Sequence, residues 1–152
     1  MTKRHLYGAM LLLAGCVANY LTDRLLNVHF EIYFGITDYS GLWILDLFVV
    51  PLIIGFIVSA LYGFGGKWIA FFIPLLTHAY SYYSFNHLAD IGGLPQGAVV
   101  QPMGWWGFFV IVAMEVALVG GVFGEAMIKR TYGRRPSHLV FKPKNTGTDN
   151  LK

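Results

Sequence analysis

Apolar residues along this chain gather in four long stretches, separated by short polar or turn-forming segments. Each stretch approaches the roughly 20 residues with which a helix crosses about 30 Å of hydrocarbon. The pattern predicts an all-α integral membrane protein, with one domain over residues 1–128 and four transmembrane helices, at residues 6–21, 42–62, 68–87 and 104–128. Tryptophans near the ends of these stretches are expected to anchor the helices at the membrane surfaces: Trp43, Trp68, Trp105 and Trp106.

The segment between the first two stretches has a different pattern, because apolar residues occupy every second position from residue 26 to residue 36. A period of two is typical of an extended strand with one apolar face. A single strand leaves its backbone groups unpaired, and residues 98–101 are the other segment on that side of the membrane able to pair with it. We therefore expect a short extended external segment, completed either by residues 98–101 as a small cap or by another protein. A further alternative is that it lies along the lipid headgroups.

Composition points the same way, since 56% of the residues are hydrophobic, only 12% are charged, and the mean hydropathy is +0.57. A water-soluble core built from 152 residues cannot bury that much apolar surface, so lipid is expected to cover part of it.

The basic residues give the predicted helices a direction. Ten of the eleven Lys and Arg lie before the first stretch, between the second and third, or after the fourth, and only Arg24 lies elsewhere. Cytoplasmic loops of membrane proteins are enriched in Lys and Arg. This places both termini on the cytoplasmic side of a bacterial inner membrane and makes residues 129–152 a basic cytoplasmic tail. The net charge of +3 then faces anionic lipid, and no nucleic-acid partner is expected.

Small residues recur at helical spacing on two of the predicted helices. Such faces let helix backbones approach closely, and here they are expected to support association with copies of the chain or with other membrane subunits. The residues are Gly55, Ser59 and Gly63 on the second helix, and Ala113, Ala117, Gly120, Gly121 and Gly124 on the fourth.

Ionisable side chains at hydrocarbon depth are the first candidates for function, since each is costly there unless it is paired or hydrated. His78 and Glu115 both fall near the middle of their predicted helices, and Asp46 lies in the outer half of its helix near Asn19. A pair formed by His78 and Glu115 would act as a proton relay or a cation site. The alternative is that these groups only join helices through hydrogen bonds.

Three further ionisable residues lie near the ends of the predicted helices. His87 and Asp90 are three residues apart, so with Asp46 they are candidate metal ligands, the alternative being an ordinary helix end with an exposed histidine. Glu125 lies four residues before Lys129, and we expect a simple ion pair between them.

The start of the chain permits a second interpretation. A charged tip, an apolar run and the residues Leu13 to Cys16 resemble the lipobox of bacterial lipoproteins, which would make Cys16 a lipidated N-terminus after cleavage. The apolar run, however, continues past Cys16 to Leu21, which favours a buried thiol within the first helix.

The sequence contains no catalytic signature. The glycines before Lys67 lack the spacing of a phosphate-binding loop, and a single cysteine leaves no thiol pair for zinc or redox chemistry. No cofactor is indicated and an enzyme is not expected. We expect a small accessory or scaffolding subunit of a larger membrane protein complex. One alternative is a small oligomeric transporter or channel using Glu115, His78 and Asp46. A third hypothesis is an external-face metal or lipid enzyme built on Asp46, His87 and Asp90.

Overall fold

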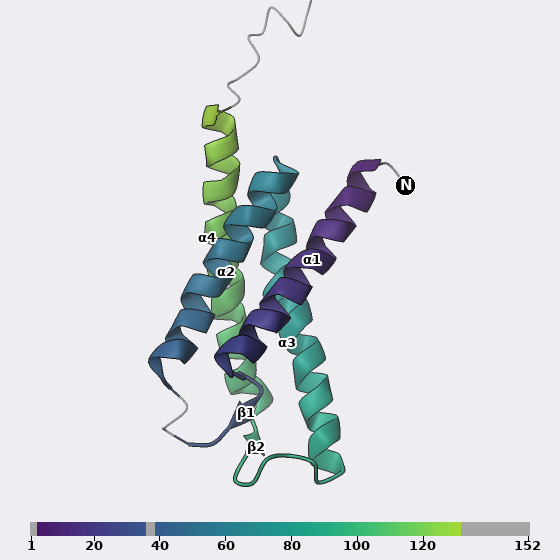
Figure 1. Ribbon diagram of the computed structural model, residues 1–152, viewed down its shortest axis with the longest axis vertical. Coiled ribbons are helices and arrows are strands. Elements are labelled where there is room, and N and C mark those ends of the chain that lie inside the picture. Colours follow the sequence, from purple (N-terminus) through teal and green to yellow (C-terminus); the bar gives the residue numbers. More distant parts are fainter. Residues whose placement is uncertain (1–2, 36–38, 132–152) are drawn as a thin grey trace, which may run out of the picture.

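Four helices and a two-stranded sheet make up the structure, a computed structural model that describes residues 3–35 and 39–131. The four helices lie side by side along the long axis of the molecule and run alternately in opposite directions (Figure 1). The elements are α1 (Lys3–Leu26), β1 (Ile32–Tyr33), α2 (Gly41–Tyr62), α3 (Gly66–Asp90), β2 (Val99–Val100) and α4 (Met103–Thr131). The prediction of an all-helical architecture is thus confirmed. Of the predicted tail, only residues 129–131 are described, and they form the end of α4.

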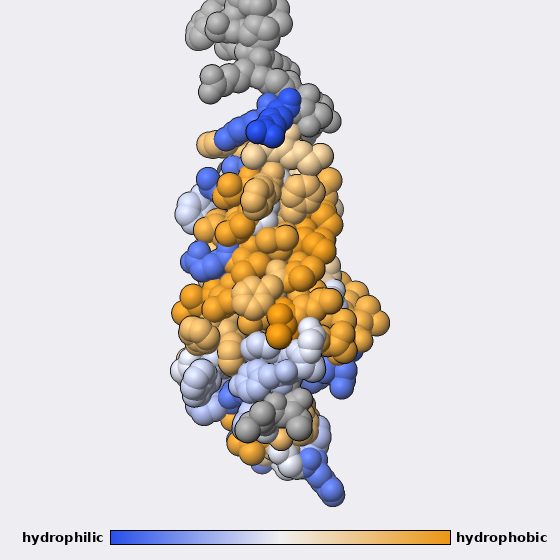
Figure 2. Space-filling view, turned by 90° about the vertical axis from the view of Figure 1, so that its left-hand side faces the viewer, coloured by the Kyte–Doolittle hydropathy of each residue, from blue (hydrophilic) through white to orange (hydrophobic). Residues whose placement is uncertain are grey.

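Three of the helices contain segments long and apolar enough to cross a membrane, namely Arg4–Leu26, Gly41–Tyr62 and Met103–Arg130. α3 is equally long, but polar residues such as Thr77, His78 and Ser81 lower its mean hydropathy, and all three of these are buried. Hydrophobic residues cover most of the middle of the molecule on the face shown in Figure 2. These features agree with a lipid environment, as the composition predicts.

Basic residues gather at one end of the bundle. The start of α1, the turn between α2 and α3 and the end of α4 all lie at this end, whereas β1 and β2 lie at the other (Figure 1). We call them the basic end and the sheet end. Arg4, Lys67, Lys129 and Arg130 therefore belong to the basic end, and Arg24 belongs to the sheet end.

Small residues of α2 and α4 bring these two helices into close contact. A Cβ on Gly55 would overlap the carbonyl of Ala117, and a Cβ on Gly120 would overlap the carbonyl of Leu52. Gly121 and Gly124 both lie against Ser59, which is fully buried. The faces expected to bind partners are therefore occupied within the chain itself.

Gly63 has a different role from the one its spacing predicts. It ends α2 with a φ of +82°, and its N–H donates to the carbonyl of Ser59 at 2.9 Å. Glycine adopts this backbone conformation without steric cost, so Gly63 acts as a helix cap and not as part of a packing face.

The extended segment pairs with its predicted partner but is buried more deeply than a surface cap. Ile32 lies opposite Val100 and Tyr33 opposite Val99 in an antiparallel sheet. Before the strand, Val28 and Phe30 enter a core cluster with Trp43, Leu47, Phe109 and Ala113. No other protein is needed to pair this strand.

The tryptophans divide between the core and the surface. Trp43 and Trp106 are buried, whereas Trp68 and Trp105 are 56% and 61% exposed. The expectation that all four tryptophans anchor the helices at the membrane surface is therefore wrong for Trp43 and Trp106. Trp43 packs edge-on against Phe30, with ring centroids 5.2 Å apart, because the inserted segment supplies an aromatic partner inside the bundle.

Candidate functional site

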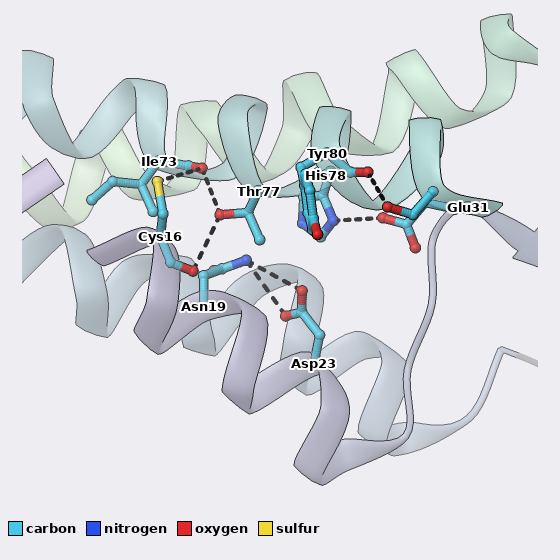
Figure 3. A network of polar contacts seen from close by, with 9 residues as sticks. Cys16, Asn19, Asp23, Glu31, Ile73, Thr77, His78 and Tyr80 are labelled. Atoms are coloured by element: carbon cyan, nitrogen blue, oxygen red, sulfur yellow. Dashed lines mark hydrogen bonds and ion pairs between the residues drawn. The ribbon is translucent and has the colours of Figure 1, made fainter. Parts of the chain in front are cut away.

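The segment before β1 places a carboxylate inside the helix bundle. The side chain of Glu31 is buried, and its Oε1 lies 3.0 Å from Nδ1 of His78 on α3, which is equally buried (Figure 3). The backbone N–H of Gln101 donates to the carbonyl of Glu31 at 2.8 Å and fixes this segment next to β2. The ring of Phe30 covers the imidazole at 4.8 Å between centroids. The sheet therefore holds Glu31 against His78.

α1 contributes two more buried polar residues. Asn19 and Asp23 lie one helical turn apart, and Nδ2 of Asn19 donates to both carboxylate oxygens of Asp23, at 3.4 and 3.5 Å (Figure 3). These long contacts are weak hydrogen bonds.

Asp46 completes this group from α2. Its side chain is 3% exposed, and its Oδ1 has no hydrogen-bond partner among the described residues. Asp46 and Asp23 both interact electrostatically with His78 and with Glu31. We refer to Asn19, Asp23, Glu31, Asp46 and His78 as the polar cluster.

Charge is not balanced in the polar cluster. It contains three carboxylates and one imidazole, and within the described part of the chain no Lys or Arg forms an ion pair with any of them. Isolated charge in a buried site is costly, so the excess of carboxylates over cations must be offset by bound protons or by a cation. Within the described residues these side chains are not arranged to hold a metal ion, so bound protons are the simpler way to offset the excess of carboxylates.

Glu115 does not join this cluster. Although it is near the middle of α4, its side chain is exposed on the outside of the bundle, whereas His78 faces Glu31 inside. The structure therefore does not form the expected pair of His78 and Glu115. Within residues 3–35 and 39–131, Glu115 has no hydrogen-bond or ion-pair partner.

The surroundings of Glu115 are apolar. On the same outward face of α4, large hydrophobic side chains are exposed above and below it, and we call this face the α4 outer stripe. Its members besides Glu115 are Trp105, Phe108, Ile111, Val119, Val122 and Phe123.

The other predicted site residues are not brought together. His87 and Asp90 are exposed in the last turn of α3, while Asp46 is buried. The described residues contain no group of three or more His, Cys, Asp or Glu side chains arranged to hold a metal ion. The external-face metal site therefore receives no geometric support.

Glu125 has a different partner from the one expected. Its carboxylate accepts the N–H groups of Gly65 and Lys67 at 2.9 and 3.2 Å, and it lies 3.9 Å from Nζ of Lys67. Glu125 thereby stabilises the start of α3, where unpaired N–H groups and the helix dipole favour a negative charge. Lys129 instead lies over the ring of Phe64, at 5.4 Å from its centroid.

Cys16 is half-buried within the uninterrupted α1. Its thiol donates to the carbonyl of Ile73 on α3, at 3.9 Å from sulfur to oxygen (Figure 3). Lipid modification at Cys16 stays a prediction of the sequence.

His29 lies outside the helices, next to the inserted segment. Its ring packs edge-on against Phe85 at 5.2 Å between centroids. Burial lowers the pKa of His29 below its ordinary value, and the positive charge of Arg24 acts in the same direction, whereas Glu31 opposes both.

The sequence pattern did not identify Asp23 or Glu31 as site residues, yet both are buried. The signal for Glu31 was weak, because it occupied one of the polar positions of a period-two segment that the fold buries on both faces.

No protein-family model matches this chain, and neither curated proteins nor solved structures give a significant match.

Proposed function

We propose that this chain is a subunit of a larger membrane protein complex and that it binds a partner helix through the α4 outer stripe. The observation that supports this proposal is the exposed carboxylate of Glu115 in an otherwise apolar face. At about 1.5 Å per residue, Glu115 lies about 18 Å along the axis of α4 from its start, well within a hydrocarbon core of about 30 Å.

Energetics favour a partner over lipid at this position. A charged side chain facing hydrocarbon costs about 2.5–3.5 kcal/mol or more, and such residues in membrane proteins almost always face other protein groups or water. The remaining members of the α4 outer stripe are apolar and offer Glu115 no hydrogen bond. The partner we propose is therefore a transmembrane helix with a Lys, Arg or amide side chain at the same depth.

The proposed threading has all four helices crossing a bacterial inner membrane, with both termini in the cytoplasm. Support comes from the gathering of Arg4, Lys67, Lys129 and Arg130 at one end of the bundle, since basic residues favour the cytoplasmic side. Although α3 is less apolar than the others, its buried polar residues would be shielded from lipid by α1, α2 and α4.

Co-purification from native membranes in a mild detergent tests the proposal. The wild-type chain should bring down a membrane protein in constant ratio, and Glu115→Leu should lose it. Ile53→Leu, at an exposed position of α2 outside the stripe, is the control and should retain it. Glu115→Gln separates two kinds of partner, because an amide partner should still bind whereas a Lys or Arg partner should bind much more weakly.

Two outcomes would overturn the proposal. One is retention of the same partner, in the same ratio, by Glu115→Leu. The other is a Glu115-dependent complex that contains only copies of this chain, which would make the chain a homo-oligomer and not a subunit of a larger assembly.

A second candidate function, movement of protons or cations, is favoured by the charge imbalance of the polar cluster. Asp46 and His78 would bind and release the positive charge, with Glu115 outside the pathway. Proton or cation flux into liposomes containing the purified chain tests this candidate. Asp46→Asn should lower the flux strongly, and flux equal to that of empty liposomes would rule the candidate out.

A further inference from the structure

A shallow groove runs between α1 and α3 on a side of the bundle that α4 does not form. It encloses about 370 Å³ and is lined by both helices. Its walls are apolar and exposed, and consist of Leu13, Val17 and Leu21 of α1 and Leu76 and Tyr80 of α3.

The polar atoms on the floor of the groove are already bonded within the chain. The hydroxyl of Thr77 donates to the carbonyl of Ile73 at 3.0 Å and the thiol of Cys16 also points to that carbonyl (Figure 3). The floor therefore offers few free hydrogen-bonding groups, and the groove favours a hydrocarbon ligand over a polar one.

A fixed cation lies at the sheet end of the groove. Arg24 donates from Nη2 to the hydroxyl of Tyr20 at 3.0 Å, and its guanidinium lies 5.2 Å from the centroid of that ring. Tyr20 lines the groove and packs edge-on against Tyr80 at 6.3 Å. Arg24 thus lies against Tyr20, one helical turn beyond it towards the sheet end, and it also lines a neighbouring pocket with His29. A guanidinium has five N–H groups, of which the Tyr20 hydroxyl takes one.

The charge of Arg24 is free to attract an anion. Arg24 is the one Lys or Arg that the sequence places at the sheet end, and no carboxylate in the described part of the chain forms an ion pair with it. Guanidinium groups bind phosphate oxygens with two parallel hydrogen bonds.

Length also fits one leaflet of a bilayer. Leu13 and Arg24 are about 16 Å apart along the axis of α1, at about 1.5 Å per residue. One leaflet of hydrocarbon is about 15 Å thick, half of about 30 Å. A chain of lipid in the groove would therefore end at mid-membrane with its headgroup at Arg24.

From these observations we infer that the groove between α1 and α3 binds one anionic phospholipid, with an acyl chain between the helices and its phosphate on Arg24. The inference is independent of the α4 outer stripe.

Native mass spectrometry of the full chain in detergent, titrated with phosphatidylglycerol, tests the inference. The wild-type chain should carry one bound lipid. Arg24→Gln should lower the occupancy by about fivefold, the effect of about 1 kcal/mol for one basic residue near a lipid surface. Val17→Trp, which fills the groove from an exposed position, should abolish binding.

Matched variants separate a specific site from general lipid adhesion. Arg4→Gln removes an arginine that also lies 5.2 Å from a tyrosine ring, at the basic end, and should leave the occupancy unchanged. Leu61→Trp adds a tryptophan at an exposed position of α2 and should also leave it unchanged. Circular dichroism confirms that each variant is folded.

The inference is overturned if Arg24→Gln and Val17→Trp bind phosphatidylglycerol as the wild type does. It is equally overturned if inorganic phosphate displaces the lipid at a concentration similar to that of the lipid, because the acyl chain would then contribute nothing to binding.

Discussion

Two glutamates on this chain occupy opposite environments. Glu31 comes from a loop, yet it is buried against His78, close to Asp23 and Asp46. Glu115 comes from the middle of an apolar helix, yet it is exposed with hydrophobic neighbours. The chain thus uses an inserted loop to provide a partner for the buried His78, but among the described residues it provides none for Glu115.

The difference teaches where to look for function. Among the interior charges, Glu31 and His78 are explained by their contact with each other. An outward carboxylate at hydrocarbon depth has no such explanation, so its partner is expected in another molecule.

His78 carries the largest expected effect. His78→Leu removes the one imidazole of the polar cluster and leaves three buried carboxylates without a cation, which should lower the free energy of unfolding in detergent by about 3–5 kcal/mol. The exposed His87 on the same helix is the control, and His87→Leu should change stability by less than about 0.5 kcal/mol. Equal losses from the two variants would contradict the burial of the cluster.

A double variant sharpens this result. Glu31→Leu combined with His78→Leu should recover part of the stability lost by His78→Leu alone, since one uncompensated carboxylate disappears with its partner.

Glycines on α4 test the inner and outer faces of that helix directly. Gly120→Ala places a Cβ against the backbone of Leu52 and should lower stability by about 1–3 kcal/mol. Gly107→Ala meets no atom within 4 Å and should be neutral or stabilising, because alanine favours a helix. Stability would be measured by chemical unfolding in detergent, and a larger loss for Gly107→Ala would contradict the packing described.

Glu115→Leu should barely alter the isolated chain. Because Glu115 makes no hydrogen bond or ion pair with the described residues, the change in unfolding free energy should be below about 0.5 kcal/mol or slightly favourable. A loss of several kcal/mol would mean that the carboxylate supports this fold and not a complex.

The smallest expected effect is a pH dependence from His29. Its pKa is lowered in the folded chain from an ordinary value of 6.5, so the folded state favours the neutral ring. Its contribution is fully present above about pH 6.5 and is lost as pH falls through the lower, folded pKa. Unfolding curves from pH 7 to pH 5 should therefore lose less stability in His29→Gln than in the wild type, and identical losses would count against the burial of this ring.

Much of the fold could be predicted from the sequence, because apolar stretches of helical length leave few alternatives. The helices are longer than predicted: α1 was expected to end at Leu21 but continues through Asp23 and Arg24 to Leu26. Hydropathy identifies only the apolar part of each helix. The helix itself continues into polar residues as long as its backbone hydrogen bonds are formed. The pairing of the extended segment was also predictable, since few other partners were present.

The candidate site could be predicted only in part. His78 and Asp46 were found from their depth in apolar helices, and both belong to the polar cluster. The partner of His78 was missed because spacing along helices says nothing of a loop that folds back into the bundle. The small-residue faces were found, but the sequence does not distinguish a contact within the chain from one between chains.

Photo-crosslinking in native membranes tests the central claim most directly. A photoreactive amino acid at Ile111 or Val119 lies in the α4 outer stripe on either side of Glu115, and one at Leu13 lies in the lipid-facing groove of α1. The account predicts one protein adduct of the same mass from Ile111 and Val119, lost in Glu115→Leu, and lipid adducts from Leu13. Lipid adducts alone from all three positions would contradict the claim that a partner covers Glu115.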